Sequence, residues 1–285
     1  MFGECHAHMI MDGVNYKAAV ALHGNGVCED AVRKHLKEST DAGVRFIRDG
    51  GDSRSVSKLA KELAPEYEID YRTPVFAIHK KGHYGGIVGY SFDDWKEYKA
   101  LIVRAKDEGA DFIKIMVSGI LDFAKAGTLT EDGLSRDEIR YMIDAAHDAG
   151  MAVMAHGNGD PTCFWTLEAG VDSLEHGFFM EEETLHLLAE RQIPWIPTLS
   201  PVGNLLGCGR FPDKEVQKNL EMQMERVEKA ASLHACVGLG SDAGAYLVPH
   251  GKGTWDEYEY LKSAGITDAV IHQAEKKIKD IFKRW

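Results

Sequence analysis

Histidine and aspartate side chains stand at the carboxyl ends of several short apolar segments in this sequence. His6 and His8 end the first segment, His156 and His176 end two later ones, and Asp242 follows the last. Imidazole nitrogens and carboxylate oxygens are the usual ligands of zinc and of other divalent transition metals. These residue types therefore predict a site that binds metal ions.

Each of these motifs, taken alone, has an ordinary structural explanation. Thirteen histidines in 285 residues give about 0.6 His-x-His pairs by chance. Taken singly, His156 and His176 are better explained as hydrogen-bonded histidines at strand ends, and Asp242 as a loop or helix-cap residue. In a strand, however, side chains alternate, so His6 and His8 point to the same side and can bind one cation. The complete set favours the metal site.

Lys114 presents a different signal, because it stands inside the apolar run from Phe112 to Val117. Burying an unpaired ammonium group is energetically expensive. Lys114 therefore needs a charged partner, a shifted pKa or a covalent modification.

Short apolar runs alternate with longer amphipathic runs along the whole chain, which is typical of βα units with a parallel sheet. We expect strands at residues 3–9, 44–48, 73–78, 111–117, 152–156, 173–176, 195–198 and 235–240. We expect helices at residues 29–42, 55–64, 93–108, 135–149, 181–191, 213–233 and 267–283. Ser135 and Glu138 have capping-box spacing, and Asp93 is the expected N-cap of the 93–108 helix. Glycines follow three of these helices, where a left-handed residue is favoured: Gly43, Gly109 and Gly150.

Eight strands with intervening helices predict an α/β fold, namely a distorted (β/α)8 barrel (TIM barrel) formed by residues 1–285 as one domain. A doubly wound sheet is the main competitor, but no Gly-x-Gly-x-x-Gly stands at a strand-to-helix junction. Loops at the carboxyl ends of barrel strands build the active site in this fold. The metal-ligand candidates stand at those ends. Residues 199–212 form the least regular stretch, either a mobile loop over the site or a simple connection.

Composition excludes several classes of protein. The chain carries 33 Lys and Arg against 45 Asp and Glu, a net charge of −12, which argues against nucleic acid as a partner. The five cysteines contain no Cys-x-x-Cys pair, so zinc ribbons and thioredoxin-like chemistry have no support. Without a signal peptide or an apolar run of membrane-spanning length, we expect a cytoplasmic protein with no membrane partner.

The ordered motifs resemble those of the amidohydrolase superfamily of metal-dependent hydrolases, in particular the binuclear type with a carboxylated lysine. The similarity is closest to the branch of imidazolonepropionase-like and prolidase-like enzymes. It lies in the segments at residues 4–8, 112–119, 153–157, 169–177 and 238–244. Many members carry a small β-sandwich, for which we expect no room beside this barrel. The apolar surface left uncovered would then favour a homo-oligomer.

The resemblance implies a role for each candidate ligand. His6 and His8 would bind one metal ion, and His156 and His176 a second. Lys114, carboxylated on its side-chain nitrogen, would bridge both ions. Asp242 would bind the first ion and shuttle a proton. The implied cofactors are two divalent ions, with zinc expected from the ligand types, while manganese, iron and cobalt fit the same set.

The implied activity is hydrolysis of a carbon–nitrogen bond in a small molecule by a metal-bridging hydroxide. An amide, an N-acyl amino acid, a dipeptide and a cyclic imide are the candidate substrates. A lactonase or phosphoester hydrolase could use the same metals. A phosphodiesterase of the polymerase-and-histidinol-phosphatase type is disfavoured, because no Asp-x-His accompanies Asp242. A non-catalytic barrel that only binds ligands is the other alternative, but the chain retains all six ligands.

Four further residues are candidates for contact with substrate. His83 follows the third expected strand and could polarise the substrate carbonyl, or it could be a solvent-facing loop residue. Arg48, at the end of the second strand, could bind a carboxylate or pair structurally with a neighbouring aspartate. Tyr246 and His250 follow the last strand and could line the pocket.

Overall fold

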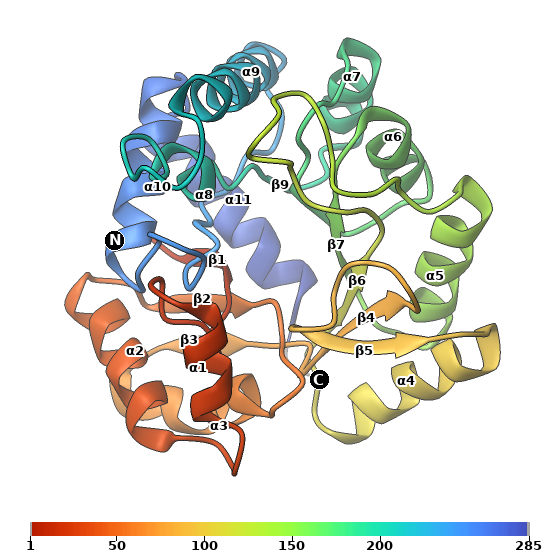
Figure 1. Cartoon of the computed structure of the whole chain (residues 1–285). Helices are drawn as coiled ribbons and strands as arrows, with labels where there is room; N and C mark the ends of the chain where they lie inside the picture. Colours follow the sequence, from red (N-terminus) through yellow and green to blue (C-terminus); the bar gives the residue numbers. More distant parts are fainter. Residues whose placement is uncertain (1, 284–285) are drawn as a thin grey trace.

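The computed structural model describes residues 2–283 as a ring of parallel strands surrounded by helices (Figure 1). The strands are β1 Glu4–Ala7, β2 Phe46–Asp49, β3 Asp70–Arg72, β4 Ala77–Lys80, β5 Gly89–Phe92, β6 Ile113–Met116, β7 Val153–Gly157, β8 Ser173–His176 and β9 Trp195–Ile196. The helices are α1 Tyr16–Leu22, α2 Glu29–Asp41, α3 Val56–Leu63, the 3-10 helix Ala64–Tyr67, α4 Trp95–Asp107, α5 Arg136–Asp148, α6 Asp160–Glu168, α7 Glu182–Arg191, α8 Ser200–Gly203, α9 Asp213–Ser232, α10 Lys252–Ser263 and α11 Asp268–Ile281.

The strands form two parallel sheets, in the orders β1-β2-β3 and β5-β4-β6-β7-β8-β9. Residues 235–243 join the open ends. The Trp195 N–H donates to the Cys236 carbonyl at 2.9 Å, and the Cys5 N–H donates to the Leu239 carbonyl at 2.9 Å. On the other side of the ring, the Asp111 N–H, just before β6, donates to the carbonyl of Thr73 at 2.9 Å. Thr73 lies in the segment that connects β3 to β4. The ring of neighbours confirms the predicted α/β fold, a distorted (β/α)8 barrel.

Two expected strands differ from the structure. The expected strand at residues 73–78 is broken, because Pro74 has no N–H to donate and Val75 has a φ of 64°, in the left-handed region. Strand β3 ends before this break and β4 begins after it. The expected strand at 235–240 forms only a single bridge, between Trp195 and Val237.

Strand β5 was not predicted from the sequence. It pairs with β4 in parallel, with Gly89 opposite Ala77. A Cβ atom at position 89 would collide with the Ala77 backbone, so the close approach of the two strands requires glycine. A single glycine of this kind gives no strand signal in the sequence.

Helix ends follow the sequence pattern closely. Ser135 and Glu138 form the predicted capping box at the start of α5. The N-cap of α4 is Asp94, one residue after the predicted Asp93, and its side chain accepts from the N–H groups of Lys96 and Glu97. Gly43, Gly109 and Gly150 all adopt positive φ, as expected. Helices α1, α6, α8 and α10 were not predicted; α6 buries Thr162 and Thr166 beside apolar residues, which hides its periodicity.

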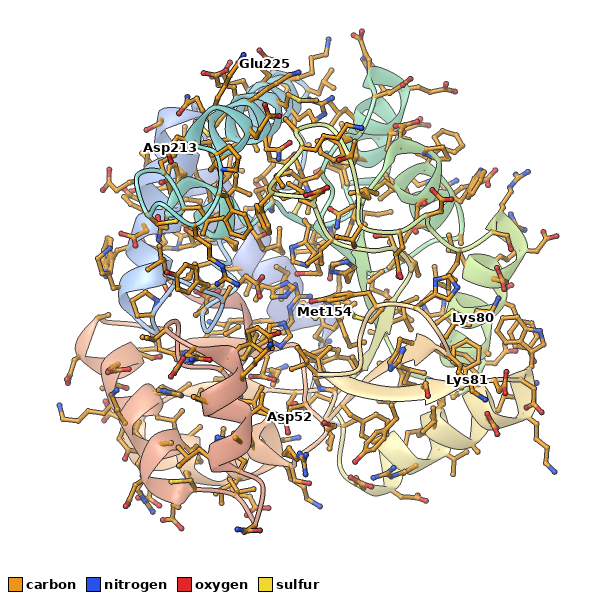
Figure 2. All side chains as sticks on the ribbon, viewed as in Figure 1. Asp52, Lys80, Lys81, Met154, Asp213 and Glu225 are labelled. Atoms are coloured by element: carbon orange, nitrogen blue, oxygen red, sulfur yellow. The ribbon has the colours of Figure 1, made fainter. Side chains whose placement is uncertain are left out.

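Helix α11 closes one end of the barrel. Its residue Ile278 and the following Phe282 are fully buried against Cys5, Phe112 and Met154 of the strands and their flanks. Figure 2 shows Met154 near the centre of the molecule, whereas the charged residues that it labels on β4 and α9 lie farther out. Among residues 2–283, no helix combines the length and the apolar character that a membrane span requires.

A buried ion pair crosses the barrel interior. Arg48 on β2 donates from Nη2 to Glu175 Oε1 on β8 at 2.8 Å, and from Nη1 to Ser173 Oγ at 2.7 Å. Its Nε donates to the Cys5 carbonyl at 2.8 Å, and its guanidinium carbon lies 4.6 Å from the centre of the Phe282 ring. Both charged side chains are completely inaccessible to solvent. The interaction therefore joins three strands where no water can replace it.

Glu175→Gln should lower the free energy of unfolding by about 3–5 kcal/mol, because it leaves the Arg48 guanidinium buried without a counter-charge. The double variant Arg48→Met/Glu175→Gln should be more stable than the single variant, since no unpaired charge remains inside the barrel. Urea denaturation of the three proteins measures both effects. A double variant less stable than Glu175→Gln would contradict the ion-pair explanation.

Candidate metal centre and its pocket

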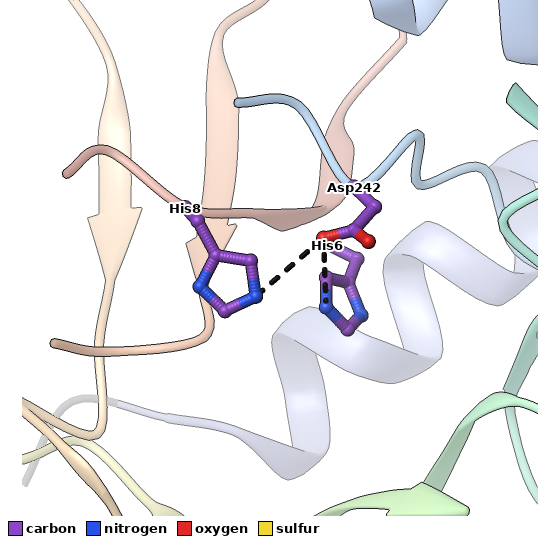
Figure 3. A group of neighbouring side chains, drawn as sticks. All are labelled: His6, His8 and Asp242. Carbon is purple, nitrogen blue, oxygen red and sulfur yellow. Dashed lines mark ion pairs between the residues drawn. The ribbon is translucent and has the colours of Figure 1, made fainter. Parts of the chain in front are cut away.

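Three predicted ligands meet at the carboxyl end of β1. His6 Nε2 lies 3.6 Å from Asp242 Oδ1, and His8 Nε2 lies 3.5 Å from the same oxygen (Figure 3). One nitrogen or oxygen atom from each of the three side chains lies within 4.8 Å of the others. The Asp242 N–H donates to the His6 carbonyl at 2.7 Å, so the backbone itself holds the loop after residue 241 against β1.

The surroundings of β1 set the orientation of both histidine rings. His6 Nδ1 lies 2.6 Å from Glu175 Oε2, the second oxygen of the carboxylate that binds Arg48. When Nδ1 donates its proton to this carboxylate, the lone pair of Nε2 faces Asp242. The His8 ring packs against Gly50, where any Cβ atom would collide with it. Each ring thus has a structural reason for its position.

Burial keeps the two rings neutral. It lowers the pKa of His6 well below its usual value, helped by the nearby positive charge of Lys114. Burial likewise lowers the pKa of His8 to about 3. A neutral imidazole has a free lone pair for a metal ion, so both side chains are ready to act as ligands near neutral pH.

His156 and His176 form a second group beside the first. Their ring centres lie 4.5 Å apart, and the His176 ring lies 4.9 Å from that of His6. His176 Nδ1 lies 2.7 Å from Thr198 Oγ1, which orients the ring. In this structure His156 Nε2 donates to the Gly119 carbonyl at 3.1 Å. Burial lowers the pKa of His156 to about 3 and that of His176 well below its usual value.

The backbone is strained at this end of the barrel. His176, Thr198 and Asp242 have φ values of 67°, 48° and 59°, which residues other than glycine rarely adopt. Such conformations each cost of order 1–3 kcal/mol and cluster at functional sites. The strain falls on two predicted ligands and on the residue that orients one of them.

Lys114 lines the same pocket as both groups, and its side chain is buried. Its Nζ has no hydrogen-bond partner within the described chain, nor do His6 Nε2 and Asp242 Oδ1. Burial lowers the pKa of Lys114 to about 8. Unpaired nitrogen and oxygen atoms buried together are costly unless a bound group satisfies them. The neutral imidazoles and the carboxylate fit divalent metal ions, and Lys114 fits them once its positive charge is removed.

A pocket of about 330 Å³ opens above these side chains. All six predicted ligands form its floor: His6, His8, Lys114, His156, His176 and Asp242. Its walls are mainly apolar and come from loops after the strands, including residues 118–134 and 199–212. The irregular stretch that follows β9 therefore lies over the candidate site, and it contributes Leu205, Arg210 and Phe211.

Of the four residues predicted to contact substrate, one lines the pocket and three do not. Tyr246 lines it. Arg48 lies in the barrel interior, fully occupied by Glu175 and its other partners. His250 does not line the pocket; it is buried against the ring of His35, and its Nε2 lies 2.9 Å from the Met11 carbonyl.

His83 lies outside the pocket lining. Its side chain is 33% exposed, and Nδ1 lies 3.6 Å from Glu131 Oε1. The neighbouring Tyr84 lines the pocket instead, with its ring 5.3 Å from that of His156. The predicted residue, His83, is therefore the sequence neighbour of the residue whose side chain lines the pocket, Tyr84. Sequence reasoning also missed Glu175, although a charge within a buried strand is the same signal that singled out Lys114.

Comparison with known proteins places the chain among relatives of similar architecture. An uncharacterised protein of Mycobacterium tuberculosis is 25% identical over 254 residues, which is 86% of this chain and 65% of that protein. The ochratoxinase of Aspergillus niger is 26% identical over 145 residues, 47% of this chain and 29% of the enzyme. This chain therefore spans less than two thirds of the length of these relatives.

Solved structures share the fold over almost the whole chain. A Xaa-Pro dipeptidase with methionine bound in its active site has a TM-score of 0.76 and 23% identity, covering 99% of this chain and 74% of that one. The Aspergillus niger ochratoxinase has a TM-score of 0.77 and 17% identity, covering 97% and 69%. The model of the amidohydrolase family, whose members generally use divalent metals, matches residues 25–252. The chain belongs to the amidohydrolase family.

Proposed function

We propose that this protein is a metal-dependent hydrolase that cleaves a carbon–nitrogen bond in a small-molecule amide, imide or dipeptide. The observation that carries the proposal is the convergence of six potential ligands on the floor of one pocket, with polar atoms left unpaired there. Membership of the amidohydrolase family supports it. So does the similarity to a Xaa-Pro dipeptidase and to ochratoxinase.

In this proposal the site holds two divalent metal ions. His6, His8 and Asp242 would hold one ion, and His156 and His176 the other, with Lys114 shared between them. Zinc suits these nitrogen and oxygen ligands, and manganese, iron and cobalt suit them as well. When bound, such ions lower the pKa of a water molecule and polarise the carbonyl of the substrate.

Lys114 is suited to carboxylation by its environment. Only a neutral amine can form a nitrogen–carbon bond to carbon dioxide, and the reaction releases one proton. With a pKa of about 8, about a tenth of the side chains are neutral at pH 7, far more than for a lysine in water. The product is an anion beside four imidazoles and one carboxylate, so the cost of an unpaired buried ammonium is removed, and the cations that these groups would hold would balance the new negative charge.

Asp242 is suited to move a proton between water and the departing nitrogen. Its Oδ1 has no hydrogen-bond partner within the described chain, and before a metal ion binds, burial raises the pKa of this carboxyl group to about 7. A general acid and base works best when its pKa is near the working pH. Asp242 would accept a proton during attack on the carbonyl and return it to the leaving amine.

Lys114→Ala should reduce the bound metal from about two equivalents per chain to about one or fewer, because the shared ligand is lost. Elemental analysis of protein purified without chelator, and reconstituted with zinc or manganese and bicarbonate, measures this. Short-chain carboxylates should partly restore the hydrolysis of an amide substrate. Lys214→Ala, at an exposed position on α9, is the matched control. Two equivalents in Lys114→Ala would contradict the bridging role, and no metal in the unaltered protein would favour a non-catalytic barrel.

Asp242→Asn should retain metal but lose turnover by about 100- to 10,000-fold, since the amide cannot take up and return the proton. Steady-state hydrolysis and metal content are measured on the same preparation. Asp132→Asn, in an exposed loop, controls for the loss of one charge. Near-normal turnover of Asp242→Asn would exclude the proton-transfer role.

A further inference from the structure

The buried carboxyl group of Glu257 on α10 is not used by the proposed chemistry. Its side chain is inaccessible to solvent and lies outside the pocket lining, so it does not contact a bound substrate. Oε1 accepts from the Leu199 N–H at 2.9 Å, and Oε2 accepts from the Ser200 N–H at 2.7 Å and from the Ser200 hydroxyl at 2.8 Å. Burying a carboxylate is costly unless it is well hydrogen-bonded, and here that bonding holds the start of α8.

Leu199 directly follows the residue that orients a predicted metal ligand. Thr198 Oγ1 lies 2.7 Å from His176 Nδ1, and Thr198 has a φ of 48°. A strained residue keeps its conformation only where contacts fix the chain on both sides of it. Before Thr198, strand β9 pairs with β8, and after it, Glu257 binds two consecutive N–H groups. Glu257 therefore helps to determine where the Thr198 hydroxyl lies.

The backbone of His176 is fixed by other contacts. Its carbonyl accepts from Trp195 Nε1 at 2.9 Å and from Gln223 Nε2 at 2.7 Å. These bonds do not set the rotation of the imidazole ring, whereas the contact of Nδ1 with Thr198 does. With Nδ1 engaged in this way, Nε2 is the ring nitrogen left for a metal ion. The orientation of this ligand thus depends on the Thr198 hydroxyl.

Helices α10 and α8 also meet at the far end of α8 (Figure 1). The Tyr260 hydroxyl donates to Asn204 Oδ1 at 3.3 Å, and Asn204 Nδ2 donates to Asp256 Oδ2 at 3.0 Å. These contacts join the same two helices but hold the residue that follows α8 rather than the residues next to Thr198. They allow the effect of Glu257 on Thr198 to be separated from the general packing of α10.

We propose that Glu257 sets the orientation of the His176 ring through Thr198, and is thereby a positioning residue for the metal ion bound there. The inference rests on the proposed function and adds to it a residue that contacts neither metal nor substrate. Glutamine is a poor substitute, because in either orientation its NH2 group faces one of the two backbone N–H groups. Groups that orient metal ligands contribute about 10- to 100-fold to metal affinity.

The test follows the histidine rings by NMR during titration with zinc and bicarbonate, using the full chain labelled with nitrogen-15 in histidine. The variants His8→Gln and His176→Gln assign the two signals. In Glu257→Gln, the His176 signal should be displaced before zinc is added, and it should need about 10- to 100-fold more zinc to respond. The His8 signal should respond at the same zinc concentration as in the unaltered protein.

Three further variants separate positioning from a general loss of stability. Thr198→Val removes the hydroxyl, keeps the shape of the side chain, and should reproduce the effect on His176. Adding Glu257→Gln to Thr198→Val should change the zinc response little further, because both act on one contact. Tyr260→Phe removes a bond at the far end of α8 and should leave both histidine signals unchanged, as should Glu259→Gln at an exposed position on α10.

Failure of this inference and failure of the proposed function give different results. A His176 signal that Glu257→Gln leaves in place overturns the inference, and so does equal weakening of the His8 and His176 responses to zinc. Absence of any histidine response to zinc in the unaltered protein would instead contradict the proposed metal site. In that case, displacement of the His176 signal in both Glu257→Gln and Thr198→Val would still support the positioning of the ring, and its absence would overturn it.

Discussion

The candidate site depends on the contacts of one buried group, the Glu175 carboxylate. One of its oxygens binds Arg48 and the other lies 2.6 Å from His6 Nδ1, so a structural ion pair and a predicted metal ligand share one group. A charge without access to solvent must be paired, and pairing at both oxygens leaves Glu175 a single position. The position of His6 Nε2 follows from it. Barrel stability and ligand orientation therefore rest on the same buried carboxylate.

The floor of the pocket contrasts with this fully paired interior. Asp49, at the carboxyl end of β2, accepts hydrogen bonds from the Met9 and Gly51 N–H groups and from the Tyr71 hydroxyl. At the floor, the facing atoms of Lys114 and Asp242 have no partner within the described chain. Buried polar groups are thus paired around Asp49, whereas at the pocket floor they lack partners within the described chain. Unpaired groups concentrated at the strand ends are the physical reason to place bound ions there.

The sequence was sufficient to predict the barrel and the polar floor of its pocket. Parallel strands of a barrel place their carboxyl ends at the same end, and this does not depend on the conformation of the loops. His6, His156 and Asp242 could be located in this way. The partner of Arg48 could not, since Glu175 lies 127 residues away and the pairing depends on packing across the barrel. The aspartates considered as partners of Arg48 are close to it in sequence, but the structure pairs Arg48 with Glu175 instead.

Most of the pocket wall could not be predicted from the sequence for a related reason, although Tyr246 and residues 199–212 were candidates. Loops take their shape from contacts with distant elements, as where residues 126 and 127 bind to α9, and no periodicity records such contacts. His83 and Tyr84 show the consequence, because they are adjacent in one loop and yet only Tyr84 lines the pocket, while His83 lies partly exposed beside Glu131. Side chains at the strand ends thus determine which reaction this fold can catalyse, and the loops determine which molecule binds as substrate.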